Sequence, residues 1–191
     1  MPIAALDACI LFQGRLTNLL LHLAAAGAFE PIWSDAIHAE WMRNLHASMG
    51  IPHDRIAYRH DQMERAFPVA NIPAPPALVT AIQGLSKTAA QRKDAHVIAT
   101  AIMAGASVIV THNIKDFSSA VLSHYGLSKT RPDPFCVDLL LSDPERVLAG
   151  IRAHRGSLRK TPMTGGEYIG QLDTVGLPRL AQALAAHMHA I

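Results

Sequence analysis

The sequence predicts an α/β fold in which strands and helices alternate. Two short apolar runs, residues 3–6 and 106–110, have the composition of buried strands, and apolar residues recur at helical spacing between them. Asp7 directly follows the first run, and Asp116 follows the second after five intervening residues. Because open α/β sheets bind ligands at the carboxyl ends of their strands, we expect both acids at one shared site.

The first half of the chain predicts two helices and a short strand after the Asp7 strand. Leucines at helical spacing predict a core-facing helix with a stop at Gly27: Leu16, Leu19, Leu20 and Leu23. Residues 31–33 are a candidate short strand. Ser34 is then the candidate N-cap of a helix that carries Glu40.

The middle of the chain predicts further helices around a proline-rich loop at residues 68–76. Apolar spacing from Ile56 to Phe67 predicts one helix, and a short helix is predicted over 78–85. Arg55, Arg59 and Arg65, in and beside the first of these helices, are expected to be available to solvent or RNA. Asp94 precedes Val97 and Ile98 by three and four residues. It is therefore expected on a helix face that packs against the sheet, where a solvated acid would not lie.

The four acids Asp7, Glu40, Asp94 and Asp116 are thus expected to converge on one pocket. Each acid alone would be read as a surface charge or a cap, but four such placements favour a site. Clustered carboxylates repel each other unless a cation compensates, and hard oxygen ligands suit Mg²⁺ or Mn²⁺. One or two such ions favour phosphodiester hydrolysis as the chemistry.

Four segments around these acids resemble the PIN-domain ribonucleases, and among them the VapC-type toxins of type II toxin–antitoxin pairs. They are Leu6–Leu11, Trp33–Glu40, Lys93–Ala101 and Val110–Phe117, and together they span roughly the first 120 residues. Their order and spacing, more than any one segment, carry the resemblance. The position of Cys9 is often Asn in this family, so its role here stays open, beside the reading of a small buried residue.

The resemblance implies an α/β/α domain with a central, mainly parallel sheet and an endoribonuclease that needs Mg²⁺ or Mn²⁺. It implies that Asp7, Asp94, Asp116 and Glu40 are catalytic and bind metal, with Glu40 acting directly, through water, or by positioning the nucleophile. Thr111 and Asn113 match polar catalytic positions beside the last acid. The implied products carry a 5′-phosphate and a 3′-hydroxyl. An antitoxin that obstructs the acidic pocket and a possible homodimer are the implied protein partners.

Other sites are disfavoured. A haloacid-dehalogenase-like phosphatase would need an acid at the position of Cys9, and a nucleotide-binding Rossmann domain would need a glycine-rich turn after the first strand. His96 lies two residues after Asp94, and such neighbouring helix positions point in different directions, so the two are not expected to form a metal pair. The two cysteines, Cys9 and Cys136, indicate neither a zinc site nor a disulfide framework.

The composition indicates a globular chain of one domain with a modest extension. Half of the 191 residues are hydrophobic, which excludes a disordered chain. The formal net charge of +2 does not by itself indicate nucleic-acid binding. Neither a signal peptide nor a membrane-spanning stretch is apparent, so the cytoplasm is expected and no membrane partner is predicted.

Residues 1–135 are expected to form the nuclease domain and residues 136–191 a helical C-terminal extension. Asp143 and Pro144 resemble a helix start, as does Pro178. The extension holds the densest basic stretch of the chain, with Arg152, Arg155, Arg159 and Lys160. These residues are candidates for binding nucleic-acid phosphates, and an ordinary solvated helix end is the equal alternative.

The leading hypothesis is therefore a metal-dependent endoribonuclease with RNA as its substrate, acting as the toxin of a toxin–antitoxin pair. One alternative is an RNA-processing or DNA structure-specific nuclease with the same site and no toxin role. Another is a catalytically inactive module that binds metal or RNA. Since all four acids are present, the inactive module ranks below the nucleases.

Overall fold

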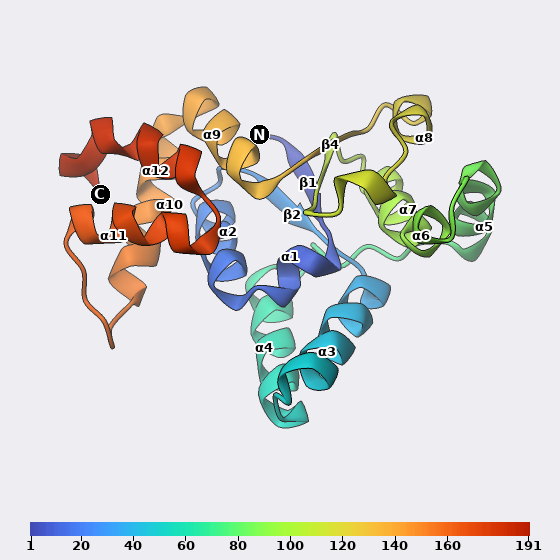
Figure 1. Ribbon diagram of the computed structural model, residues 1–191, viewed down its shortest axis with the longest axis horizontal. Coiled ribbons are helices and arrows are strands. Elements are labelled where there is room, and N and C mark those ends of the chain that lie inside the picture. The colour runs from blue at the N-terminus through green and yellow to red at the C-terminus, as the bar shows by residue number, and fades with distance from the viewer. The chain divides into compact units, whose positions relative to one another are not determined.

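Four parallel strands form a single sheet in the computed structural model, which describes all of residues 1–191 (Figure 1). The strands are β1 (Ile3–Leu6), β2 (Glu30–Ile32), β3 (Val108–Val110) and β4 (Ser128–Thr130), in the order β2-β1-β3-β4. Ala4 pairs with Pro31 on one side and with Val108 on the other. The predicted α/β class with a parallel sheet is confirmed.

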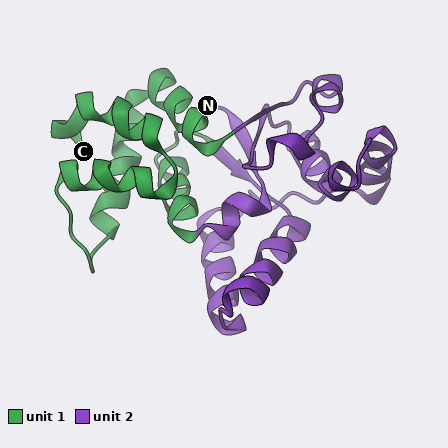
Figure 2. Cartoon of the chain, viewed as in Figure 1, with its two compact units in different colours: residues 1, 14–29, 131–191 green, residues 2–13, 30–130 purple.

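The chain divides into two compact units (Figure 2). The sheet unit contains residues 2–13 and 30–130, and the helical unit contains Met1, residues 14–29 and residues 131–191. The helical unit therefore includes the expected extension together with residues 131–135 and the segment 14–29. No helix in the structure is both long enough and apolar enough to span a membrane.

The sheet unit surrounds its strands with short and medium helices. They are α1 (Ala8–Phe12), α3 (Asp35–Met49), α4 (His53–Ala66), α5 (Pro76–Leu85), α6 (Ala89–Lys93), α7 (Ala95–Met103), the 3₁₀ helix η1 (Ile114–Asp116) and α8 (Ser119–His124). Helix α7 packs against β1 and β3, with Val97 and Ile98 buried. The expected apolar stripe of this helix is therefore the face that builds the core.

Asp94 differs from the expectation that it lies within a helix. It ends α6 and is the N-cap residue of α7, with φ −88° and ψ 5°, and its side chain makes no capping hydrogen bond. Thr88 caps α6 by accepting the Gln91 N–H, which starts a separate short helix ahead of Asp94. The apolar period that begins at Val97 placed Asp94 on the correct face but did not reveal this helix break.

Two other side chains in the sheet unit are placed differently from the sequence expectation. Ser34 is the N-cap residue of α3, as predicted, but its buried hydroxyl makes no hydrogen bond. Arg59 is not free for solvent or RNA: its guanidinium lies 4.8 Å from the Trp41 ring centroid and donates to the Leu11 carbonyl. Burial lowers the pKa of Arg59 to about 10. Arg59 thus ties α4 to the end of α1.

The helical unit consists of α2 (Gly14–Ala25), α9 (Pro132–Ser142), α10 (Pro144–Ser157), α11 (Gly165–Leu172), η2 (Asp173–Val175), α12 (Pro178–Leu184) and η3 (Ala185–Ala190). The predicted helix starts at Pro144 and Pro178 are confirmed. Asp143 caps α10 by accepting the Arg146 N–H at 3.2 Å. Helix α2 packs against α10, so the predicted core-facing leucines belong to the core of this unit.

Candidate active site

A cavity of about 470 Å³ in the sheet unit gathers residues that follow the carboxyl ends of β1 and β3. Three of the predicted acids line it: Asp7 after β1, Glu40 on α3 and Asp94 between α6 and α7. Asn113 lines it too. The remaining lining residues are Cys9, Phe12, Gln13, Asn44, Ser48, Lys93 and His112. Segments that are distant in sequence thus bring their carboxylates to one cavity.

Thr111 and Asp116 lie outside the lining of this cavity but act on the residues within it. Thr111 is fully buried, and its hydroxyl donates to Asp7 Oδ2 at 2.6 Å. The Asn113 N–H donates to Thr111 Oγ1 at 2.9 Å, which leaves the hydroxyl proton for Asp7. Asp116 ends η1, and its negative charge contributes to the raised pKa of Asp94.

Cys9 is part of the same arrangement. Its thiol donates to Asp7 Oδ2 at 3.1 Å, and its sulfur accepts the His112 N–H at 3.3 Å. Burial, and next the charge of Asp7, raise the pKa of Cys9 to about 12, so the group is a neutral donor rather than a thiolate. Both the thiol and the Thr111 hydroxyl donate to Oδ2, which restricts the orientation of the Asp7 carboxylate.

The electrostatics of the cavity centre on Asp94, whose side chain is 7% exposed. Burial raises the pKa of Asp94 to about 7, and the charges of Asp7, Glu40 and Asp116 add to the increase. The nearby Lys93 acts in the opposite direction. Burial thus disfavours the ionised form of Asp94 most, and the neighbouring carboxylates add to this effect.

Lys93 and His96 are site residues that the sequence analysis missed or discounted. Lys93 Nζ lies 2.6 Å from Glu40 Oε1, and this contact raises the pKa of Lys93. His96 Nδ1 donates to the Lys93 carbonyl at 2.9 Å, which leaves Nε2 buried, without a hydrogen-bond partner, 3.8 Å from Glu40 Oε2. The His96 ring therefore faces Glu40 rather than its sequence neighbour Asp94.

The donor set of the cavity fits a hard divalent cation. Carboxylate oxygens dominate it, as Mg²⁺ and Mn²⁺ prefer, and Asp7 is already oriented by two donors on one oxygen. Burial, and next the neighbouring acids, raise the pKa of Asp94, and a bound cation would oppose both effects by favouring the ionised carboxylate. Cys9, which contacts Asp7, is a neutral thiol and so does not supply the thiolate ligand of a softer zinc-type site.

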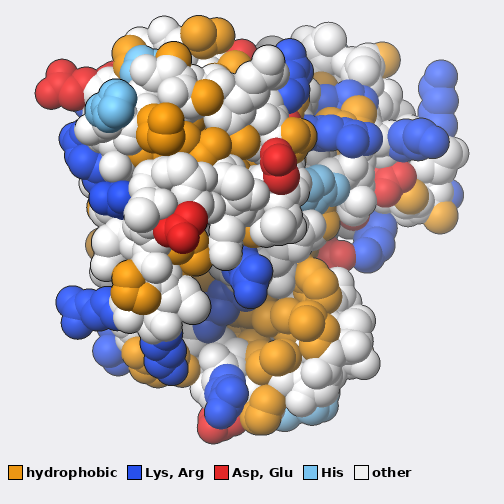
Figure 3. All heavy atoms as spheres, turned by 60° about the vertical axis from the view of Figure 1, so that its left-hand side comes forward, with side chains coloured by type: hydrophobic (Ala, Val, Ile, Leu, Met, Phe, Trp, Pro, Cys, Tyr) orange, Lys and Arg blue, Asp and Glu red, His pale blue; other side chains and the backbone are white.

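The predicted basic residues all lie in the helical unit, at the end of α10 and just beyond. Arg152 donates to the Ala190 carbonyl at 2.6 Å, and Arg155 donates to the Met163 carbonyl at 3.4 Å. Arg159 and Lys160 are exposed. On the face shown in Figure 3, Lys and Arg side chains are scattered rather than gathered in one patch. Only part of the basic stretch is therefore free to bind phosphates.

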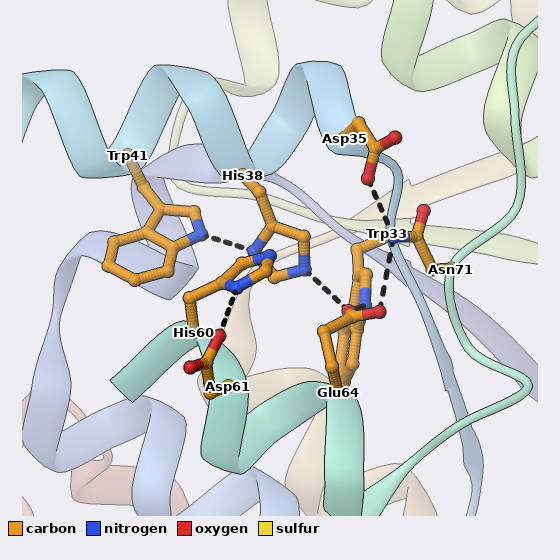
Figure 4. Close-up of polar contacts among 8 residues, drawn as sticks. All are labelled: Trp33, Asp35, His38, Trp41, His60, Asp61, Glu64 and Asn71. Carbon is orange, nitrogen blue, oxygen red and sulfur yellow. Dashed lines mark hydrogen bonds and ion pairs between the residues drawn. The ribbon is translucent and has the colours of Figure 1, made fainter. Parts of the chain in front are cut away.

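A second polar cluster of the sheet unit joins α3 and α4 through His38 and Glu64 (Figure 4). The Trp41 indole N–H donates to His38 Nδ1 at 2.8 Å, so the neutral ring carries its proton on Nε2, 3.0 Å from Glu64 Oε1. Burial, and next His60, lower the pKa of His38, which keeps the ring neutral. His38 therefore has no ring nitrogen left for a metal ion.

The Glu64 carboxylate is satisfied in the same way. It accepts the Trp33 indole N–H at 2.6 Å on Oε1 and the Asn71 amide at 3.2 Å on Oε2. Asn71 also donates to Asp35 Oδ1 at 2.7 Å. These hydrogen bonds connect the start of α3, the last turn of α4 and the following loop, so the cluster is best explained as structural support for α3, which carries Glu40.

Comparison with known protein families agrees with this geometry. The model of the PIN domain matches residues 4–115, more than half of the chain, and the model of the VapC50 C-terminal domain matches residues 132–186. No match was found among curated proteins or among solved structures. Members of the PIN and VapC families are generally nucleases that use divalent metal ions. The chain therefore belongs to the PIN-domain family, and its C-terminal part groups it with the VapC-type members.

Proposed function

We propose that this protein is a metal-dependent endoribonuclease that hydrolyses RNA phosphodiester bonds and acts as the toxin of a type II toxin–antitoxin pair. One observation carries the proposal: Asp7, Glu40 and Asp94 come from three segments and line one cavity, in which burial, and next the charges of Asp7 and Glu40, raise the pKa of Asp94. Perturbed acids in a cavity are typical of functional sites. The family matches support a nuclease of the VapC type.

Asp7, Asp94, Asp116 and Glu40 are the residues that would hold one or two Mg²⁺ or Mn²⁺ ions. A divalent ion at this site supplies activation of water and neutralises charge on the leaving oxygen. Thr111 and Cys9 hold the Asp7 carboxylate in one orientation. Lys93 neutralises Glu40 and brings a positive charge to the cavity that receives the RNA phosphate, and Asn113 offers an amide there.

The biological setting is part of the same proposal. Residues 1–135 carry the nuclease, and residues 136–191 form the extension that accompanies it. The partner is an antitoxin encoded nearby that blocks the acidic cavity, with a homodimer as a second assembly, and the site of action is the cytoplasm. The VapC-type match of residues 132–186 supports this setting.

The test compares wild type with Asp94→Asn on cellular RNA, with Mg²⁺, with Mn²⁺ and with a chelator, followed by mapping of the 5′ ends. We expect cleavage only for wild type with metal, with a loss of at least about 100-fold in Asp94→Asn because a carboxylate at the metal site is removed. Asp54→Asn, an exposed acid in the first turn of α4, is the matched control and should cleave like wild type. Equal cleavage by Asp94→Asn would refute the site.

The same preparation separates the other candidate functions. Cleavage of structured DNA in preference to RNA would favour the structure-specific nuclease. Binding of metal and RNA without any cleavage would favour the inactive module. Growth arrest on expression, relieved by the product of the adjacent gene, would support the toxin role, whereas RNA cleavage without growth arrest would favour RNA processing.

A further inference from the structure

The helical unit contains a pocket of its own, with a volume of about 180 Å³. It lies between the start of α2, the end of α10, the following loop, α11 and η2. Apolar side chains form most of its wall: Leu19, Leu158, Met163, Leu172 and Val175. Pockets that enclose whole drug-sized ligands measure about 300–1,000 Å³. This pocket therefore has room for one planar ring system rather than for a complete nucleotide.

A neutral aromatic pair contributes to the lining. His154 Nδ1 lies 2.7 Å from the Tyr168 hydroxyl, and the two side chains are 8% and 2% exposed. Burial, and next the neighbouring His22, lower the pKa of His154 to about 4, so the ring is uncharged at neutral pH. The inner surface thus combines the edges of two aromatic rings with apolar side chains. His154 and Tyr168 are uncharged, so a neutral base could pack against them without desolvating a charge.

The polar groups of the pocket lie among its exposed lining residues. Arg15, Asn18 and Gln171 are exposed and offer a guanidinium and two amides. Amides present both a donor and an acceptor, as the edge of a nucleobase does, and arginine pairs with phosphates or with guanine. No carboxylate lines the pocket. The lining therefore favours an anionic ligand with an uncharged ring.

The basic stretch of the extension is adjacent in sequence to residues that line the same pocket. Leu158 and Thr161 line it, and the exposed Arg159 and Lys160 lie between them in sequence. Arg155 donates to the carbonyl of Met163, another lining residue, and so supports the loop at the pocket. Exposed cations in this stretch can bind the phosphates of a nucleic-acid strand.

We propose that this pocket encloses one unpaired nucleobase, while the exposed Arg15 in its lining binds the 5′-phosphate of the same nucleotide. Single-stranded RNA is recognised by splaying out a base, contacting its ring and hydrogen-bonding its edge, and the pocket offers each of these contacts. The source is either an unpaired base of the RNA substrate or a free mononucleotide. The RNA source rests on the proposed ribonuclease function, whereas binding of a base to the pocket does not.

The experiment uses the full-length chain with a chelator present, so that RNA stays intact, and follows methyl signals by NMR. The probes are the four nucleoside 5′-monophosphates, a single-stranded RNA hexamer and an abasic hexamer of the same phosphate content. We expect saturable shifts of the Met163 and Leu172 methyl groups, while Met188 outside the lining stays unshifted. Tighter binding of the hexamer than of any monophosphate indicates an RNA base, and the reverse order indicates a free nucleotide.

Variants locate the binding. Gln171→Ala and Arg15→Ala should each weaken it about tenfold, since each loses one base or phosphate contact. Val175→Trp should abolish it by filling the pocket. Arg179→Ala removes one exposed positive charge from the same unit outside the lining, so it should bind like wild type.

Three results would overturn the proposal: no shift with any nucleotide probe, equal shifts with the abasic hexamer, or shifts caused only by a peptide from the antitoxin. RNA cleavage is measured separately on the same protein with metal. RNA cleavage without shifts of the pocket methyl signals would reject the base site and would still support the ribonuclease function. Shifts of the pocket methyl signals without RNA cleavage would reject the ribonuclease function and support the base site.

Discussion

Asp7 shows at the scale of single residues how the site is built in advance of its ligand. Oδ2 is engaged by Thr111 and Cys9, two neutral donors, and neither draws the negative charge away as a salt bridge would. The Thr111 hydroxyl is itself oriented by the Asn113 N–H. Such supporting hydrogen bonds fix the position of a metal ligand and so raise the affinity for metal.

Thr111→Val tests this support because it removes the hydroxyl and keeps the shape. We expect Mn²⁺ binding, followed by calorimetry, to weaken by about 10- to 100-fold, the usual effect of removing such a partner. RNA cleavage at limiting metal should fall in parallel and recover in part at high metal concentration. An unchanged metal affinity would show that Cys9 alone orients the carboxylate.

Thr100→Val is the matched control for this substitution. Thr100 lies in α7, is fully buried, and its hydroxyl has no hydrogen-bond partner. Replacing an unsatisfied buried hydroxyl by a methyl group is expected to be neutral or stabilising, because the desolvation cost of about 1–3 kcal/mol is relieved. Metal affinity should stay at the wild-type value.

At the scale of elements, the contact between α2 and α10 holds the helical unit together at Gly150. A Cβ atom at this position would lie 2.9 Å from the His22 carbonyl oxygen and from Leu23 Cα, and both of these atoms belong to the backbone. Backbone atoms cannot rotate away as a flexible side chain can. The two helices therefore approach as closely as they do because position 150 has no side chain.

Gly150→Ala is therefore expected to destabilise the protein by about 1–3 kcal/mol, the usual cost of overpacking. Gly156→Ala in the same helix is the control, since nothing lies within 4 Å of a Cβ there. It should stabilise by up to about 1 kcal/mol through helix propensity. Urea unfolding of both variants measures the difference, and equal stabilities would contradict the close helix contact.

The same elements show what the sequence alone reveals. Asp7 and the helix starts at Pro144 and Pro178 follow local patterns, an apolar run or a proline at the first helical position, and these were predicted. Strand β4 (Ser128–Thr130) was missed because its residues are polar and its place depends on pairing with β3. The packing of α2 against α10 joins segments far apart in the chain and leaves no local signal.

In the candidate site, too, features with a local sequence pattern were predicted and features that depend on the fold were not. The position of Asp94 relative to its apolar helix face was apparent from spacing, whereas the helix break before α7 was not. The ion pair between Lys93 and Glu40 joins residues 53 positions apart, and no local pattern indicates it. The role of Cys9 as a donor to Asp7 likewise depends on the burial that the fold provides.

At the scale of the whole molecule, the two units are expected to respond to pH in opposite directions. Asp94 in the sheet unit has a pKa raised to about 7, so between about pH 4 and pH 7 the folded protein holds a proton that the unfolded chain has lost. His154 in the helical unit has a pKa lowered to about 4. Between about pH 4 and pH 6.5 its ring is therefore protonated in the unfolded chain and neutral in the folded protein.

The signs follow from proton linkage, because stability rises with pH wherever the unfolded state binds more protons. The contribution of Asp94 in the metal-free protein is therefore lost as pH rises from about 4 to 7. The contribution of His154 is present above about pH 6.5 and is lost as pH falls towards 4. In wild type the two effects oppose each other, so each is visible only when the other is removed.

Thermal unfolding from pH 4.5 to 8 in a chelator tests both contributions through two non-titrating variants. Relative to wild type, Asp94→Asn should gain stability as pH rises, because it lacks the ionisation that burial disfavours. His154→Gln should gain relative stability as pH falls below 6.5. Mg²⁺ should raise the unfolding temperature of wild type most at pH 8, where Asp94 is ionised, and should have little effect on Asp94→Asn. A Mg²⁺ effect that is equal at pH 5 and pH 8 would show that ionisation of Asp94 is not linked to metal binding.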